Sequence, residues 1–203
     1  MVSGQQLPLW IKLVFTAWIL FWAPAYAILL GAENYFWLCN LASFLILIGL
    51  WLESRPLLSM QWLSVVLIGL LWGLDLAVAW LTGWHPFGGT AYMLDPDFPN
   101  LARLLSFYHL LLPLVAGYAI FRVGYQAKAL LYQTLLTWLM IALTYWLTDP
   151  ERNINWVHAP FGVDQDFLPP MVYLVVLALA WPVLIYLPVH FLTLWLERRR
   201  HRS

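Results

Sequence analysis

The stretch LLSMQWLSVVLIGLLWGLDLAVAWL, residues 57–81, decides the fold of this chain. It is mostly apolar and carries one charged side chain, that of Asp75. An α-helix needs about 20 predominantly apolar residues to cross the hydrocarbon core of a bilayer. The stretch therefore predicts a transmembrane helix with an ionisable group inside it.

Five further apolar runs accompany this one. The six predicted spans are residues 7–30, 35–52, 57–81, 101–121, 127–147 and 168–196. Hydrophobic residues make up 63% of the 203 positions and charged residues only 10%, whereas a soluble domain carries about 25% charged residues. The sequence predicts an all-α, polytopic transmembrane helical bundle of about six spans, with residues 1–203 forming a single integral membrane domain.

The first span has a second interpretation. Lys12, the apolar stretch after it and the segment Ala25-Tyr26-Ala27 together resemble a signal peptide with a small-residue cleavage site. The region before the apolar stretch is only weakly basic, which favours an ordinary first transmembrane helix. Cleavage would leave five spans.

Basic residues in the loops predict the orientation of the chain. With six spans, two of these residues, Arg103 and Arg152, fall on one side, and eight fall on the other. The eight are Lys12, Arg55, Arg122, Lys128, Arg198, Arg199, Arg200 and Arg202. Lys and Arg accumulate in cytoplasmic loops. We therefore expect a multi-pass protein of the plasma (inner) membrane with both ends in the cytoplasm.

Three reactive side chains lie at similar depths in different spans. Counted from the non-cytoplasmic end at 1.5 Å per residue, Cys39 is roughly 6 Å deep, Asp75 roughly 10 Å and His109 roughly 12 Å. Ionisable groups inside a membrane are costly and typical of functional sites. A thiol, an imidazole and a carboxylate are the groups of a nucleophile, its general base and the residue that orients the base. We expect these three residues to be catalytic.

The depth of these residues indicates a lipid ester as the substrate, and acyl transfer through a thioester on Cys39 as the reaction. Polar residues around them are candidates for binding that substrate, either at the oxyanion or at a polar headgroup. These candidates are Asn40, Tyr108, Arg152, Asn153, Asn155 and Trp156. The expected function is that of an intramembrane lipid acyltransferase or lipid hydrolase.

Structural explanations compete with this hypothesis. A lone cysteine in a helix is commonly a packing residue, and Asp75 and His109 could form an interhelical hydrogen bond. A non-catalytic lipid-binding or membrane assembly protein is therefore the alternative. Transport of a small solute is less favoured, because no pair of broken helices occupies corresponding halves of the chain.

Few other partners are expected. The spacing of His and Cys matches no zinc motif, so we expect neither a metal nor a cofactor. A net charge of zero argues against nucleic acid. The expected partner is a membrane lipid, and the sequence leaves a homodimer open.

Several short motifs resemble those of a known family. The segment Trp37-Leu38-Cys39-Asn40 resembles the cysteine motif of the YwaF-like integral membrane proteins, and Phe107-Tyr108-His109 resembles their histidine-containing helix. Asn153-Ile154-Asn155-Trp156 and the last span are similar to their Asn-rich loop and closing helix. That family includes eukaryotic transmembrane acyltransferases that make ether phospholipids. The resemblance implies a six-helix bundle with Cys39 as nucleophile and His109 as its partner.

The chain departs from the YwaF-like pattern at one position, and it also resembles a second group of proteins. Trp37 stands where the YwaF-like family often carries a histidine. The chain also resembles a set of bacterial hypothetical membrane proteins through the segment His85-Pro86-Phe87-Gly88-Gly89-Thr90 and the Asn153–Trp156 segment.

Overall fold

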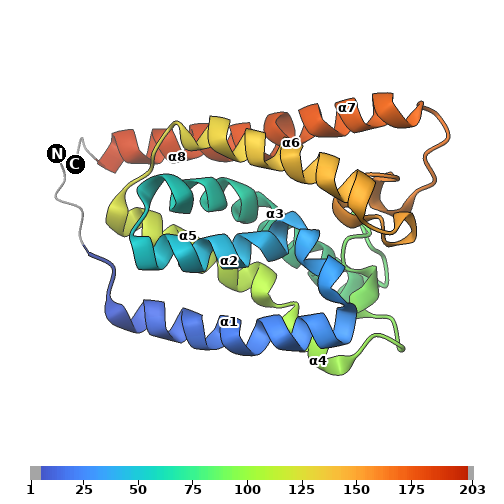
Figure 1. Ribbon diagram of the computed structural model, residues 1–203, viewed down its shortest axis with the longest axis horizontal. Helices are drawn as coiled ribbons and strands as arrows, with labels where there is room; N and C mark the ends of the chain where they lie inside the picture. Colours follow the sequence, from blue (N-terminus) through green and yellow to red (C-terminus); the bar gives the residue numbers. More distant parts are fainter. Residues whose placement is uncertain (1–5, 201–203) are drawn as a thin grey trace.

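The computed structural model describes residues 6–200 as a bundle of helices (Figure 1). The helices are α1 (Leu9–Leu30), α2 (Leu38–Leu52), α3 (Arg55–Thr82), α4 (Asn100–Leu105), α5 (Tyr108–Val123), α6 (Ala129–Leu147), α7 (Pro170–Ala180) and α8 (Leu187–Arg200). Short turns connect them: η1 (Ala32–Phe36), η2 (Ala91–Met93), η3 (Pro150–Arg152), η4 (Ile154–Trp156), η5 (Pro160–Gly162) and the π-helical η6 (Trp181–Tyr186). No strand occurs in residues 6–200, which confirms the predicted all-α class.

Each predicted apolar run corresponds to a helix or to a continuous series of helices. The second run differs most, because its first two residues belong to η1 and α2 begins only at Leu38. The fourth run is interrupted between α4 and α5, where the Ser106 carbonyl accepts a hydrogen bond from the His109 side chain at 2.8 Å. A side chain that takes a backbone acceptor competes with regular helix hydrogen bonding.

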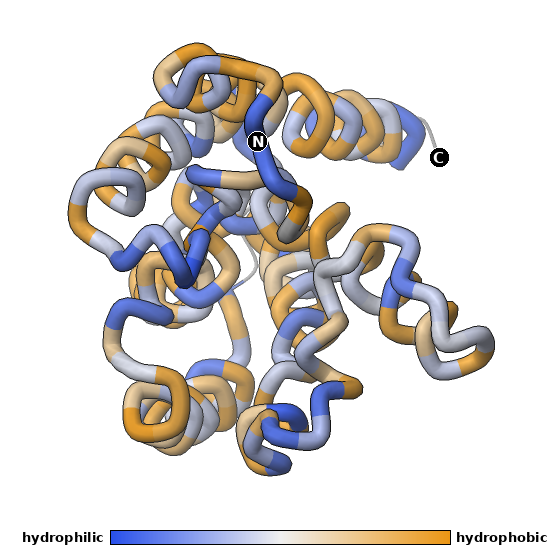
Figure 2. The backbone as a smooth tube through the Cα atoms, turned by 90° about the vertical axis from the view of Figure 1, so that its right-hand side faces the viewer, coloured by the Kyte–Doolittle hydropathy of each residue, from blue (hydrophilic) through white to orange (hydrophobic). Residues whose placement is uncertain are grey.

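Five of these helical segments are long and apolar enough to cross a membrane. They are Leu9–Leu30, Arg55–Thr82, Asn100–Val123, Ala129–Leu147 and Pro170–Arg200, and α2 is a shorter apolar helix of 15 residues. Large apolar side chains point outward, as at Leu20, Leu81 and Leu114, which are 71%, 86% and 71% exposed. Figure 2 shows hydrophobic positions on all sides of the bundle. Such an outer surface fits lipid and not water, as in an integral membrane protein.

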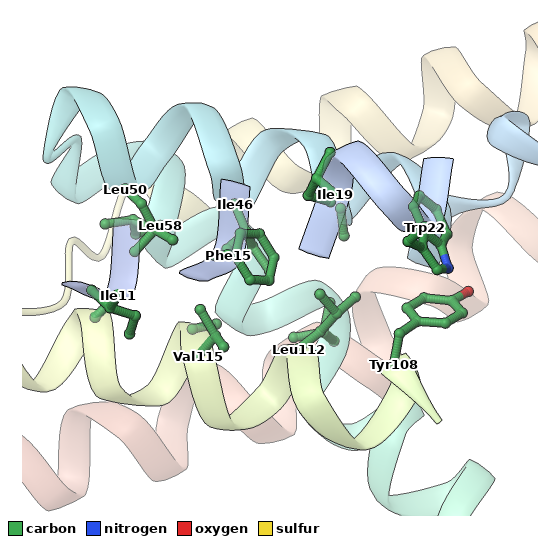
Figure 3. Packing of buried hydrophobic residues seen from close by; sticks show 14 of the residues in the cluster. Ile11, Phe15, Ile19, Trp22, Ile46, Leu50, Leu58, Tyr108, Leu112 and Val115 are labelled. Carbon is green, nitrogen blue, oxygen red and sulfur yellow. The ribbon is translucent and has the colours of Figure 1, made fainter. Parts of the chain in front are cut away.

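One side of α1 packs into the bundle. Figure 3 shows Ile11, Phe15, Ile19 and Trp22 of α1 facing residues of α2, α3 and α5. These positions recur every three or four residues, which places them on one face of the helix. Tyr26 continues the same face, is 4% exposed and shares a 2.8 Å hydrogen bond with the Ser106 hydroxyl. The segment resembling a cleavage site is therefore part of a packed helix, which favours the transmembrane interpretation of this span.

Two glycines allow α3 and α5 to approach closely. A Cβ atom on Gly69 would lie 2.3 Å from the His109 carbonyl oxygen and 2.7 Å from Pro113 Cγ. A Cβ atom on Gly73 would meet only the end of the Leu110 side chain, at 3.0 Å. Glycines four residues apart form a small-xxx-small face, which favours close helix packing in membranes. This contact fixes the position of His109 relative to α3.

The two ends of the bundle differ. Figure 1 shows the start of α1 and the end of α8 at one end, while the connections 31–37, 83–99 and 148–169 gather at the other. Between these ends, buried polar side chains connect α3, α6 and η6: Gln61 donates to Gln133, Gln133 donates to Thr137, and the Thr137 and Tyr186 hydroxyls lie 2.6 Å apart. Interhelical hydrogen bonds of this kind hold membrane helices together.

Candidate functional site

A cavity of about 490 Å³ lies toward the end of the bundle where the three long connections gather. Residues of α1, α2, α3, α5, α7 and η6 line it, together with η1, η2 and the turns η3 to η5. Eleven of the lining residues are aromatic: Tyr26, Trp37, Trp72, Phe87, Tyr92, Phe98, Tyr108, Trp156, Phe161, Tyr173 and Trp181. Among the described lining residues, Arg152 is the one Lys or Arg and Asp75 the one Asp or Glu.

The structure brings eight of the nine predicted site residues to this cavity. They are Cys39, Asn40, Asp75, Tyr108, His109, Arg152, Asn155 and Trp156. Asn153 is the exception, because it does not line the cavity and its side chain is used within its own loop. The Asn153 Oδ1 atom accepts from the backbone N–H groups of His158 and Ala159 at 2.9 and 3.1 Å, and Nδ2 donates to the Ala159 carbonyl. Its predicted contact with a headgroup is therefore replaced by a structural role.

The thiol of Cys39 lies at the start of α2 beside a tyrosine. The Tyr108 hydroxyl lies 3.1 Å from Cys39 Sγ and is also hydrogen-bonded to Asn40 Oδ1. Asn40 Nδ2 in turn donates to the Asn34 carbonyl at 2.6 Å. Tyr108 is the first residue of α5, so this cluster connects the beginnings of two helices. The partner of the thiol is thus a neutral hydroxyl.

The imidazole of His109 is held from two sides. Its Nδ1 atom lies 2.8 Å from the Ser106 carbonyl, which can only accept, so Nδ1 carries the proton. The ring stacks on Trp72, with centroids 4.9 Å apart and an interplanar angle of 9°. Within residues 6–200 no hydrogen bond reaches Nε2, and none joins His109 to Cys39. The free Nε2 is the atom with which His109 can accept a proton.

Asp75 does not orient His109, contrary to the sequence-based expectation. One carboxylate oxygen accepts from the Phe87 backbone N–H at 2.7 Å. The other accepts from the Thr90 N–H at 2.9 Å and from the Thr90 hydroxyl at 2.6 Å, and His85 Nδ1 lies 4.0 Å from it. Three donors thus engage the buried carboxylate, and its role is to hold the 85–90 loop over the cavity.

The segment 150–162 closes the cavity on another side. The Asn155 side chain accepts from the Leu38 backbone N–H at 2.9 Å and donates to the Phe36 carbonyl at 2.8 Å, so it caps the start of α2. The Trp156 ring packs edge-on against Trp37, and the Trp156 carbonyl accepts from the Tyr173 hydroxyl at 2.6 Å. The segment therefore connects the site to α2 and α7.

The sequence did not predict most of the other lining residues, among them two polar residues of the short connections. Asn34 lies in η1 and Tyr92 in η2, within connections whose fold no periodic pattern predicts. Burial raises the pKa of Tyr92 to about 12, so its hydroxyl stays neutral at physiological pH. That hydroxyl accepts from Trp72 Nε1 at 3.1 Å, and Trp72 carries the stacked His109 ring. The polar residues of these short connections were the signal that could have found them.

Metal ligands are not grouped in the described part of the chain. No set of three or more His, Cys, Asp or Glu side chains within residues 6–200 could hold a metal ion. The lining of the cavity is mostly aromatic and apolar, with a small number of polar groups.

The fold and the site define an all-α membrane protein with a cavity inside the bundle. No protein-family model, curated protein or solved structure matches the chain. The functional argument therefore rests on the geometry of the cavity.

Proposed function

We propose that this protein binds a membrane lipid in the cavity, with the polar part of the lipid beside Cys39, Asn40, Tyr108 and His109. The observation that carries the proposal is the cavity itself, at about 490 Å³ with a lining that is largely aromatic and apolar. Small-molecule sites have volumes of about 300–1,000 Å³, apolar walls and a few convergent polar groups. An amphipathic molecule with one polar end matches that distribution.

Filling the cavity should abolish lipid binding. Ala180 lines the cavity from α7, whereas its neighbour Leu179 does not and is 54% exposed. We expect Ala180→Trp to lower lipid occupancy at least about tenfold, because the indole occupies the space of the ligand. Leu179→Trp, which adds a ring on the outward face of the same helix, should leave occupancy unchanged.

The measurement is native mass spectrometry of the protein released from lipid nanodiscs, with retained lipid counted for each variant. Thermal unfolding of both variants establishes that they are folded. Equal occupancy in the wild type and in a folded Ala180→Trp variant would refute binding at this cavity.

Acyl transfer is a second candidate function, and the observation that favours it is that the Cys39 thiol and the free Nε2 edge of His109 belong to the same cavity. In this reaction the Cys39 sulfur attacks the ester carbonyl, and the thiol proton passes to His109. A thioester forms, the ester C–O bond breaks, and the leaving alcohol oxygen takes the proton. An acceptor hydroxyl or water then cleaves the thioester and restores the thiol.

This reaction requires His109 to approach Cys39, which it does not contact in the present arrangement. Catalytic hydrogen bonds often form only once substrate is bound. The proposal is also the one that the resemblance to the YwaF-like family implies. Without such an approach, the same cavity binds lipid and performs no chemistry.

A covalent acyl adduct distinguishes the two functions. Cys39 is the only cysteine in the sequence, so an adduct that hydroxylamine removes reports on this residue alone. Under acyl transfer, intact-mass analysis with a phospholipid donor should detect the adduct in the wild type. Loss of the general base in His109→Gln should slow its formation by about 10²–10⁴-fold. No adduct in wild-type protein that retains lipid would leave binding as the function.

The proposed orientation is N-in and C-in in the plasma (inner) membrane. Contacts support a shared basic end: Lys12 pairs with Glu53, Arg55 bonds to the Tyr125 carbonyl and Arg122 bonds to the Gln6 carbonyl. The cavity would then open toward the non-cytoplasmic leaflet. A fluorescent reporter that folds only in the cytoplasm should fluoresce when it is fused to the C-terminus. Absence of fluorescence from an expressed fusion protein would contradict the proposed orientation.

A further inference from the structure

One wall of the cavity carries an amide side chain that is not hydrogen-bonded within the described chain. Asn34 is 8% exposed and lines the cavity. Its backbone groups are used, since the carbonyl accepts from Asn40 Nδ2 and from the Trp37 N–H. Its side-chain amide makes no hydrogen bond to residues 6–200 and lies at the cavity wall. An amide carries two N–H donors and a carbonyl acceptor, so these groups are available to a ligand in the cavity.

A cation lies against the same short segment. Arg152 lines the cavity, and its Nη2 donates to the Leu30 carbonyl at 2.8 Å. Its Nη1 is 3.5 Å from Glu33 Oε2, and Glu33 is the residue before Asn34. A guanidinium has five N–H donors, so these two contacts leave donors for a ligand. No other Lys or Arg belongs to the described lining.

We infer that Asn34 and Arg152 form an oxyanion site that selects a lipid carrying a phosphate or carboxylate group. The inference rests on the proposed lipid binding and adds the chemical class of the ligand. Guanidinium donors match the geometry of both groups, and hydrogen bonds to charged oxygens are about twice as strong as neutral ones. The Asn34 amide adds a neutral donor, and the aromatic walls accept the apolar remainder of the lipid.

Glu33 weakens this site in the unliganded protein. The Glu33 side chain is 43% exposed and does not line the cavity, and its carboxylate pairs with the Arg152 guanidinium. An anionic ligand competes with Glu33 for the guanidinium. Removing the Glu33 charge therefore strengthens the site, whereas removing the Arg152 charge weakens it.

The test compares three probes in a lipid-binding competition with the full-length protein. The probes are dioleoyl phosphatidic acid for phosphate, oleic acid for carboxylate and diolein as the neutral control. We expect the wild type to prefer one or both anionic probes over diolein by at least about tenfold. Whichever anionic probe binds tighter identifies the phosphate or the carboxylate as the preferred group.

Arg152→Gln should lower the affinity for the preferred anionic probe by about 10- to 100-fold, and Asn34→Ala by about 3- to 10-fold. Both should weaken diolein binding far less than binding of the anionic probe, because a neutral lipid lacks the charged oxygens that the guanidinium binds. Glu33→Gln should raise anionic affinity, and Arg152→Lys, which keeps the charge but loses the forked geometry, should fall between wild type and Arg152→Gln. Thermal unfolding of each variant verifies that it is folded.

Two results would overturn the inference. If wild type binds diolein as tightly as both anionic probes, the cavity binds lipid without an oxyanion site. If Arg152→Gln and Asn34→Ala weaken all three probes equally, the two residues only maintain the shape of the cavity. Failure of every probe to bind wild type would instead refute the lipid-binding proposal together with this one.

Discussion

Gly69→Ala should destabilise the bundle strongly, by about 2–3 kcal/mol or more. The added methyl group would lie 2.3 Å from the His109 carbonyl oxygen and 2.7 Å from Pro113 Cγ, both on α5. A backbone atom and a proline ring cannot rotate away, so α3 and α5 must separate. Overpacking typically costs about 1–3 kcal/mol and occasionally more. The higher helix propensity of alanine, about 1 kcal/mol, offsets only part of that cost.

Gly73→Ala is the matched control for this change. Its methyl group would meet only Leu110 Cδ2 at 3.0 Å, which is the end of a flexible side chain. We expect a change of less than about 1 kcal/mol, because rotation of Leu110 relieves the contact. Thermal unfolding in detergent measures both variants. Similar melting temperatures for the two variants would contradict the close α3–α5 approach at Gly69.

Asp75→Ala should release the 85–90 loop from the cavity. The substitution removes the acceptor of three hydrogen bonds, from the Phe87 N–H, the Thr90 N–H and the Thr90 hydroxyl. Hydrogen bonds to charged groups contribute about 1.5–3 kcal/mol each, and they are not additive. We therefore expect a loss of about 3 kcal/mol or more in the stability of the loop. The Phe87 and Thr90 amides should then exchange hydrogen much faster.

Hydrogen–deuterium exchange resolved to these amides is the direct measurement. Thr90→Val is the matched control, since it removes only the hydroxyl donor and keeps both backbone N–H groups. Its exchange should rise less than that of Asp75→Ala. Unchanged protection of both amides in Asp75→Ala would show that the carboxylate does not hold the loop.

The helices were predictable because lipid imposes one requirement on them, a long apolar segment. Residues 57–81, for example, lie entirely within α3 (Arg55–Thr82). The start of α2 was less predictable, because Asn155, which lies far away in the sequence, caps the Leu38 N–H. No local pattern contains that contact.

The sequence predicted that the three proposed catalytic residues share one site, but it did not predict which groups each of them contacts. Depth along the spans placed Cys39, Asp75 and His109 in one layer, and all three line the cavity. Depth says nothing about which way a side chain faces around its helix. The Asp75 carboxylate faces the loop donors of Phe87 and Thr90, and His109 faces Trp72 and the Ser106 carbonyl.

Photo-crosslinking tests most directly whether a lipid occupies the cavity. The protein is placed in nanodiscs that contain a phospholipid with a diazirine in one acyl chain. After irradiation, the adducts are mapped along α3. Ile68 and Leu71 line the cavity, whereas Leu70 and Leu74 are 63% and 52% exposed on the outer surface. Lipid in the cavity predicts adducts on Ile68 and Leu71 that disappear in Ala180→Trp. Adducts confined to Leu70 and Leu74 would show that lipid contacts only the outside of the bundle and would contradict the proposed function.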